Sequence, residues 1–213
     1  MQATRVIAIR HGETAWNSES RIQGQTDIGL NPTGAWQATR LPAALADEGI
    51  DAVYSSDLIR TLDTATALAD SCGLPVLPDA DLRERCFGEF EGHTFAEIEA
   101  RWPVLSERWR RRDADFGPAG GEVLADFYAR SMSAATRLVA AHLGQTVVLV
   151  THGGVLDCLY RAATRISLQA PRTWQIGNAG INRLLYSEAG FVLVGWNDVG
   201  HLEPGGEAGR EAG

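Results

Sequence analysis

The chain has 213 residues, of which 45% are hydrophobic and 22% are charged, and this composition excludes wholesale disorder and fibrous repeats. All 19 strongly basic residues are arginines, and a sequence without lysine excludes Schiff-base enzymes and conventional phosphate-binding P-loops. The formal net charge of −8 argues against a dedicated nucleic-acid-binding protein. An anionic substrate must therefore meet positive charge that is concentrated locally.

The cysteines and the apolar segments indicate a cytoplasmic protein with no membrane contact. The chain has an odd number of cysteines, namely Cys72, Cys86 and Cys158, and their spacing matches no metal or redox motif. The apolar stretch within residues 1–13 is too short for a signal peptide, and no apolar run reaches membrane-spanning length. We expect the thiols to be reduced and buried or inert.

In chain order, apolar runs predict strands at 6–9, 51–54 and 146–150. Their patterns are continuous rather than alternating, which is typical of strands that are covered on both faces in a parallel sheet. A further strand is expected at 191–194. The segment 183–186 is expected to pair with it through a turn at 187–190.

Helical spacing predicts helices after these strands, at 58–69, 123–143 and 154–163. Another helix should begin at Asn31-Pro32 and run towards Gly49, with Pro42 kinking or splitting it. Residues 82–121, which are rich in Glu, Arg and Trp, do not fit this alternation and are expected to form an insertion over the end of the sheet.

These elements together predict an α/β fold. We expect a three-layer αβα sandwich with a mostly parallel central sheet and a partly helical cap insertion at about 82–121. A single domain is predicted over 1–204. The Gly-rich end, 205–213, is predicted to be a flexible tail because it cannot bury apolar surface.

Three of the predicted strands lead directly to basic side chains. The first ends at Arg10-His11, the second leads to Arg60, and the third ends at His152. Because ligands of open α/β sheets bind beyond the carboxyl ends of the strands, these groups should converge on one rim near helix N-termini. Arginine side chains that can donate two hydrogen bonds at once, histidines and the N–H groups at helix N-termini together predict a binding site for a dianion.

A zinc site is the alternative for two histidines at a sheet edge. It is disfavoured, because Arg10 and Arg60 would lie against the cation and no third ligand stands at motif spacing. We therefore expect no metal and no cofactor.

The motifs resemble those of the histidine phosphatase superfamily, which includes the cofactor-dependent phosphoglycerate mutases. The resemblance spans about 5–202, in the family's order, and rests on Arg10-His11-Gly12-Glu13-Thr14, Trp16-Asn17, Arg21-Ile22-Gln23-Gly24, Ser55-Ser56-Asp57-Leu58 with Arg60, Glu84, Phe87-Gly88, Glu91-Gly92, Gly120-Gly121-Glu122, Thr151-His152-Gly153-Gly154 and Asn197-Asp198 with His201-Leu202.

The resemblance implies a role for each residue that matches. His11 would be the nucleophile that forms a phosphohistidine, with one ring nitrogen held by a nearby backbone carbonyl. Glu84 would protonate the leaving oxygen and then activate water. The other catalytic residues implied are Arg10, Arg60 and His152, which would clamp the phosphoryl oxygens, and the substrate-binding residues implied are Asn17, Gln23, Gly24 and the N–H of Gly153.

Within that family the sequence favours a phosphomonoesterase of the small, broad-specificity branch, acting on a small anionic phosphometabolite. The length, Gln23 before Gly24 and the missing lysine favour it. Glu84-Arg85 and Trp109-Arg110-Arg111 partly match the mutase pattern, so a cofactor-dependent phosphoglycerate mutase is one alternative. The other alternative is a protein that binds a phosphorylated ligand at a catalytically inactive site. The expected partners are a small phosphorylated metabolite and, as a candidate assembly, a second copy of the chain.

The Arg-rich segment 101–112 of the cap has two interpretations. It is either a solvated helix face or a recognition surface for a second anionic group of the substrate. The cap offers for this the arginines Arg101, Arg108, Arg110, Arg111 and Arg112 together with Trp102, Trp109 and, just beyond the segment, Phe116.

Overall fold

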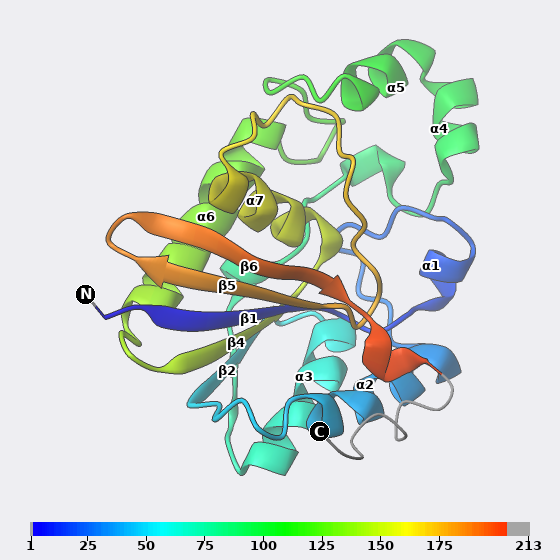
Figure 1. Ribbon diagram of the computed structural model, residues 1–213. Helices are drawn as coiled ribbons and strands as arrows, with labels where there is room; N and C mark the ends of the chain where they lie inside the picture. The colour runs from blue at the N-terminus through cyan, green and yellow to red at the C-terminus, as the bar shows by residue number, and fades with distance from the viewer. Residues whose placement is uncertain (1, 204–213) are drawn as a thin grey trace.

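The computed structural model describes residues 2–203, which form a three-layer αβα sandwich (Figure 1). Six strands make one sheet in the order β3-β2-β4-β1-β5-β6. The strands are β1 (Thr4–Arg10), β2 (Ala52–Ser55), β3 (Val76–Pro78), β4 (Thr146–Thr151), β5 (Ile181–Ser187) and β6 (Gly190–Asp198). Neighbours from β3 to β1 are parallel, whereas β5 and β6 add an antiparallel edge.

The predicted strands are confirmed because burial follows their apolar patterns. All six residues of β4 are buried, since β1 and β2 flank it and helices cover both of its faces. The predicted hairpin is also present, with Tyr186 paired to Phe191 and Ser187 to Gly190. Strand β3 was not predicted, because it is a three-residue edge strand that ends in proline and is only partly buried.

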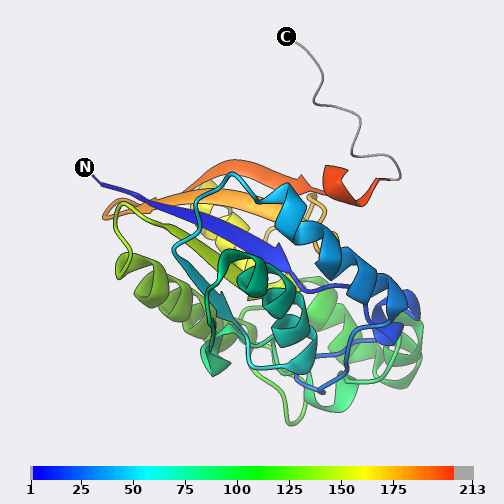
Figure 2. The ribbon, with the colours of Figure 1, turned by 90° about the horizontal axis from the view of Figure 1, so that it is seen from below.

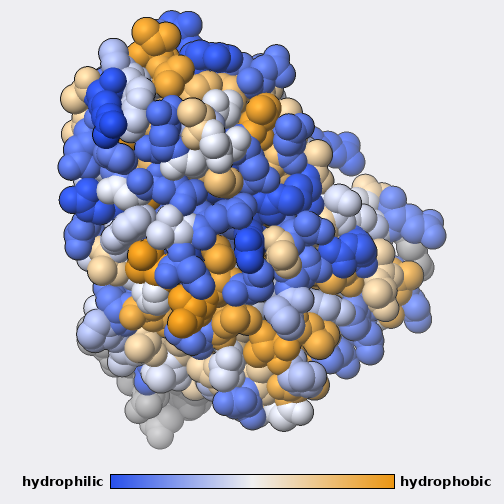
Figure 3. All heavy atoms as spheres, turned by 180° about the vertical axis from the view of Figure 1, so that it is seen from behind, coloured by the Kyte–Doolittle hydropathy of each residue, from blue (hydrophilic) through white to orange (hydrophobic). Residues whose placement is uncertain are grey.

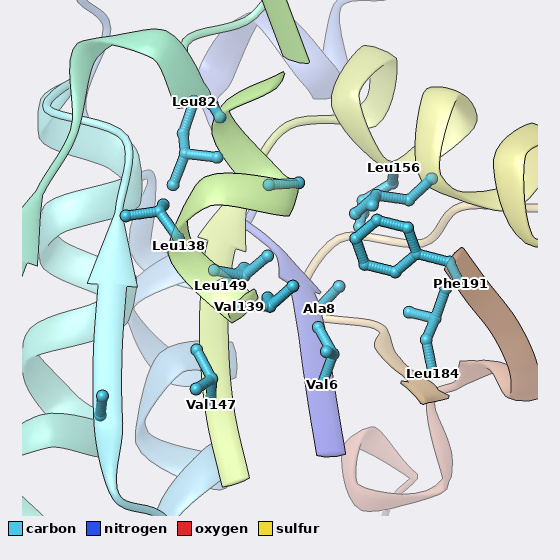
Figure 4. Close-up of a cluster of buried hydrophobic side chains, with 14 residues drawn as sticks. Val6, Ala8, Leu82, Leu138, Val139, Val147, Leu149, Leu156, Leu184 and Phe191 are labelled. Carbon is cyan, nitrogen blue, oxygen red and sulfur yellow. The ribbon is translucent and has the colours of Figure 1, made fainter. Parts of the chain in front are cut away.

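Two pairs of helices enclose the sheet. Figures 1 and 2 show α2 (Pro32–Ala44) and α3 (Ile59–Cys72) side by side on one face, and α6 (Leu124–Ala140) and α7 (Gly153–Thr164) on the other. On the α6–α7 face, Leu138 and Leu156 pack against Val147 and Leu149 of β4 (Figure 4). Every one of these four side chains is nearly inaccessible to solvent, so the sheet is anchored rigidly beneath the site.

Two helices are shorter than predicted. Helix α2 begins as expected, with Asn31 capping the N–H of Gly34 at 2.8 Å. Of the two effects expected of Pro42, a kink or a split, the split does not occur, because the helix continues through Pro42 and the Leu45 N–H still bonds to the Leu41 carbonyl. The helix ends at Ala44 rather than near Gly49. Helix α6 likewise ends at Ala140, three residues before the predicted end.

Between β3 and α6 the chain leaves the sandwich and forms the helices α4 (Phe95–Arg101) and α5 (Pro103–Arg110), which lie beyond the sheet in Figure 1. This segment has its own apolar cluster, centred on Phe90, Ile98 and Phe116. It corresponds to the insertion expected at about 82–121. The single domain over 1–204 stays a prediction, and the predicted tail, 205–213, lies outside the described residues.

The surface opposite the view of Figure 1 is mixed, with hydrophilic residues across its middle and hydrophobic ones in separate groups (Figure 3). Within residues 2–203, no helix is both long enough and apolar enough to cross a membrane.

Candidate active site

A cavity of about 520 Å³ opens where β1, β2 and β4 end, between the sandwich and the α4–α5 segment. Eight of the nine predicted site residues line it: Arg10, His11, Asn17, Gln23, Gly24, Arg60, Glu84 and Gly153. The ninth, His152, lies against the His11 ring instead, with ring centroids 5.2 Å apart. The structure thus brings together residues that are up to 143 positions apart in the chain, since it joins Arg10 to Gly153.

His11 follows β1 and is fixed in one orientation. Its Nδ1 lies 2.7 Å from the Gly12 carbonyl oxygen, and the Gly12 N–H donates to Thr64 Oγ1 at 2.9 Å. Because a carbonyl only accepts, Nδ1 carries the proton and Nε2 keeps its lone pair. Burial, and then the charges of Arg60 and Arg10, hold the pKa of His11 well below its usual range. The imidazole is therefore neutral at physiological pH.

Two arginines flank His11 without a carboxylate partner. Arg60 is completely buried at the start of α3, and its Nη atoms donate to the carbonyls of Thr26 and Gly24 at 2.9 and 2.7 Å. Arg10 donates to the Ile176 carbonyl at 2.7 Å. Burial lowers the pKa of Arg10 to about 10 and also lowers the pKa of Arg60.

The Nε atoms of both arginines are buried and have no hydrogen-bond partner among the described residues. Buried guanidinium nitrogens without acceptors are costly, so this arrangement is built for an anion. His152 adds a third such atom, because its Nε2 contacts Ser56 Oγ at 2.9 Å while its buried Nδ1 has no partner within residues 2–203.

Two side-chain amides that line the cavity have their oxygens engaged by protein donors, which leaves their NH2 groups available to a ligand. The Asn17 oxygen accepts from the Thr14 N–H at 3.2 Å and from Asn178 Nδ2 at 3.1 Å. The Gln23 oxygen accepts from Thr14 Oγ1 at 2.9 Å. Asn178, which also donates to the His11 carbonyl at 3.0 Å, was missed by the sequence analysis because it comes from a distant loop without a local signal.

Glu91 holds the loop that carries Gln23 and Gly24. Its carboxylate accepts the N–H groups of Gln25, Thr26 and Phe87 at 3.1, 3.0 and 2.9 Å. Gly24 has a φ of 53°, and a Cβ there would lie only 2.0 Å from Glu91 Oε1. This position therefore requires glycine on two grounds, and Glu91 acts as a positioning residue for the loop.

Glu84 lines the same cavity as Arg10 and Arg60 and is oriented by two backbone donors. Oε1 accepts the Arg85 N–H at 2.8 Å and Oε2 accepts the Gly154 N–H, at the start of α7, at 2.9 Å. A Cβ on Gly154 would lie 2.0 Å from Glu84 Oε1, so the approach of the carboxylate to the helix depends on that glycine. A carboxylate held in this position can donate or accept a proton at a bound ester.

The Arg-rich segment 101–112 divides between the surface and the cavity. Trp109, Arg110 and Arg112 line the cavity. Trp102 and Phe116 instead belong to the apolar cluster beneath α4 and α5. The remaining arginines lie outside the cavity wall: Arg101 stacks on Trp102, Arg108 pairs with Asp113 and Arg111 pairs with Glu107.

The neutral state of His11 predicts a loss of stability in acid. The folded protein keeps this imidazole uncharged, whereas the unfolded chain binds a proton below about pH 6.5, so the free energy of unfolding falls as the pH falls through that value. When the pH is lowered from 7.5 to 5.5, the free energy of unfolding should fall for both proteins. The fall should be smaller for His11→Gln than for the unsubstituted protein, by up to about 1.4 kcal/mol. Urea unfolding at both pH values measures this, and equal losses would show that His11 is not held neutral.

Comparisons with known proteins identify the family of the chain. The model of the histidine phosphatase superfamily (branch 1) matches residues 6–199. Phosphoglycerate mutase-like protein 4 of Arabidopsis thaliana is 41% identical, over 94% of this chain and 88% of its own. The metal-independent phosphoserine phosphatase of the same plant is 36% identical, over 94% and 84%.

Among solved structures, the phosphoserine phosphatase of Entamoeba histolytica in complex with 3-phosphoglyceric acid superposes with a TM-score of 0.84. It is 30% identical, over 94% of this chain and 100% of that one. The chain belongs to the histidine phosphatase superfamily. Within it, the chain is an enzyme of the phosphoglycerate mutase-like type.

Proposed function

We propose that the protein is a metal-independent phosphomonoesterase that transfers the phosphoryl group of a small metabolite to His11 and then to water. The observation that carries this proposal is that His11, whose Nε2 keeps its lone pair, lines one cavity with Arg10 and Arg60, whose buried Nε atoms lack partners within residues 2–203. This arrangement supplies a neutral nucleophile and two guanidinium groups that form no ion pair with a carboxylate within the described residues.

In the first step, His11 Nε2 attacks phosphorus and the bond from phosphorus to the ester oxygen breaks. Arg10, Arg60 and the His152 Nδ1 atom stabilise the charge that develops on the three equatorial oxygens. The NH2 groups of Asn17 and Gln23 and the N–H of Gly153 add neutral donors. Glu84, in its protonated form, gives its proton to the leaving oxygen, so that an alcohol departs.

In the second step, the Glu84 carboxylate accepts a proton from water, whose oxygen attacks phosphorus. The bond to His11 Nε2 breaks, inorganic phosphate forms, and the neutral imidazole is restored. The Gly12 carbonyl supports both steps, because its hydrogen bond keeps the proton on Nδ1.

A mutase would have to retain the phosphohistidine and return it to a bound phosphoglycerate. Two of the arginines that partly match the mutase pattern are paired with carboxylates, since Arg110 pairs with Glu99 at 2.9 Å and Arg111 pairs with Glu107 outside the cavity wall. The sequence also has no lysine. These features favour hydrolysis over isomerisation.

Phosphate release is expected to persist when divalent ions are removed. The positive charge at the site comes from arginine, and residues 2–203 contain no group of three or more His, Cys, Asp and Glu placed to hold a metal. The test is release of inorganic phosphate from a metabolite panel in EDTA without a bisphosphoglycerate primer. Activity that EDTA abolishes and a divalent ion restores would overturn metal independence. Primer-dependent isomerisation of 3-phosphoglycerate with little free phosphate would identify a mutase.

The setting of the enzyme is also a proposal. A cytoplasmic location is supported by the three free cysteines, one of which, Cys72, is exposed. A homodimer is supported by the apolar side chains of Leu185, Val192 and Val194 on the edge hairpin, which are 38%, 54% and 61% exposed. The net charge of −8 supports a small metabolite rather than nucleic acid as the partner.

A further inference from the structure

Three of the seven arginines that line the cavity form an ion pair with an acidic side chain. Arg21 pairs with Glu19 and Glu97 at 2.9 and 3.1 Å. Arg110 pairs with Glu99, and Arg112 pairs with Asp157 at 2.6 Å. The arginines without a carboxylate are Arg10, Arg60, Arg85 and Arg172.

Arg172 differs from the other three uncompensated arginines. Arg10, Arg60 and Arg85 are each held by backbone carbonyls, and Arg85 donates to those of Phe116 and Glu122 at 2.6 and 3.0 Å. Arg172 is exposed at the mouth of the cavity, and within residues 2–203 it makes no hydrogen bond or ion pair. Among the described residues, Arg172 is therefore the one arginine lining the cavity whose N–H donors are all free to bind a ligand.

The loop that carries Arg172, residues 165–180, is tethered on both sides of it. On the N-terminal side, Arg112 Nε donates to the Leu168 carbonyl at 2.7 Å. On the C-terminal side, Trp174 stacks on Tyr160 of α7 with ring centroids 4.0 Å apart. Pro171, which also lines the cavity, restricts the backbone immediately before Arg172.

Two further hydrogen bonds fix the loop beyond Trp174. The Gln175 carbonyl accepts from Trp196 Nε1 at 2.8 Å, and the Ile176 carbonyl accepts from Arg10 at 2.7 Å. Arg10 thus joins the phosphate site directly to this loop. The backbone at Arg172 is held in place over the cavity, so that only its side chain has to become ordered when a ligand binds.

The charge around Arg172 has the same sign as that of the phosphate site. The pKa of Arg10 is lowered to about 10 by burial, an effect that Glu84 opposes and that the positive charges of Arg172 and Arg60 reinforce. Placing Arg172 near Arg10 is electrostatically unfavourable in the free protein. A ligand with a second anionic group, in addition to its phosphate, relieves that repulsion.

We propose that Arg172 is a specificity-determining residue that pairs with a second anionic group of the substrate, most simply a carboxylate. This inference rests on the proposed phosphomonoesterase function and names its substrate class: small phosphomonoesters that also carry a carboxylate. It assigns the recognition to the loop between α7 and β5 rather than to the α4–α5 segment, whose cavity-lining Arg110 and Arg112 are already paired.

The experiment compares 3-phosphoglycerate with glycerol 3-phosphate, which lacks the carboxylate, and with p-nitrophenyl phosphate. Arg172→Gln should lower kcat/KM for 3-phosphoglycerate by about tenfold, mainly through KM, because a charge-assisted hydrogen bond to the carboxylate is lost. The other two substrates should change less than about twofold. Arg172→Lys should restore part of the loss by keeping the charge. Arg111→Gln, which removes one positive charge outside the cavity, is the matched control and should have no effect.

The outcomes separate this inference from the function on which it rests. An enzyme that hydrolyses all three esters, but whose Arg172→Gln variant loses activity equally on all or on none, would overturn the role of Arg172 and leave the phosphomonoesterase proposal standing. An unsubstituted protein that hydrolyses none of the three would overturn both.

Discussion

His11→Ala is expected to reduce phosphate release by at least about 1,000-fold. The variant lacks the imidazole that the proposed mechanism uses as the nucleophile, so the covalent route is lost and only positioning of the phosphate remains. The measurement is steady-state phosphate release with saturating substrate.

The control for His11→Ala is His142→Ala, which removes an imidazole at the opposite end of the sheet, where it contacts Tyr54 Oη at 2.9 Å. That variant should keep its activity, and circular dichroism should show both variants folded. A folded His11→Ala protein that retains more than about a tenth of the activity would show that the nucleophile is misassigned.

Glu84→Gln is expected to slow hydrolysis of alkyl phosphates by about 100-fold or more, because an alkoxide is a poor leaving group without a proton. With p-nitrophenyl phosphate, whose leaving oxygen needs no proton, formation of the phosphoenzyme should be slowed less than about tenfold. The second step should still be slow, since the amide cannot activate water. Stopped-flow absorbance should therefore show a burst of one p-nitrophenol per site, followed by a slow steady state.

The pair of substrates is the control in this experiment, because the same variant protein is compared with itself. Equal losses in the burst rate on p-nitrophenyl phosphate and in the turnover of an alkyl ester would assign Glu84 a positioning role. That outcome is physically reasonable, since Glu84 already bridges the N–H groups of Arg85 and Gly154.

The sequence predicted most of the sheet because burial on both faces leaves a clear pattern. The run at 146–150 is continuous and β-branched, and it forms the fully buried β4. Burial gave no such signal for β3, where Leu77 and Pro78 are exposed at the sheet edge. The extent of α2 was also overestimated, since the turn that follows Ala44 depends on packing rather than on local propensity.

The core of the site was predictable because its residues directly follow strands that end at the same edge. His11 and Arg60 were expected there, Glu84 was expected from the family resemblance, and all three line one cavity. The supporting contacts of Asn178 and Glu91 were not predictable, because they join segments that are distant in the chain and have no shared local pattern.

The sequence could not predict which arginines of segment 101–112 reach the cavity and which stay on the surface, for a different reason. Helix α5 ends at Arg110, and Arg112 takes a left-handed backbone with a φ of 54°. This turn directs Arg112 to Asp157, while Arg111 stays on the surface. Arg172 was missed altogether, since a lone arginine in a loop is usually a solvated charge.

The central claim, that the phosphoryl group passes through His11, is tested most directly by rapid-quench trapping with radiolabelled substrate and peptide mapping. The account predicts an acid-labile, alkali-stable phosphoramidate on the peptide that contains His11, formed at a rate no slower than turnover and absent from His11→Ala. Label on another residue would contradict it, and so would hydrolysis with inversion of configuration at phosphorus and no trapped adduct.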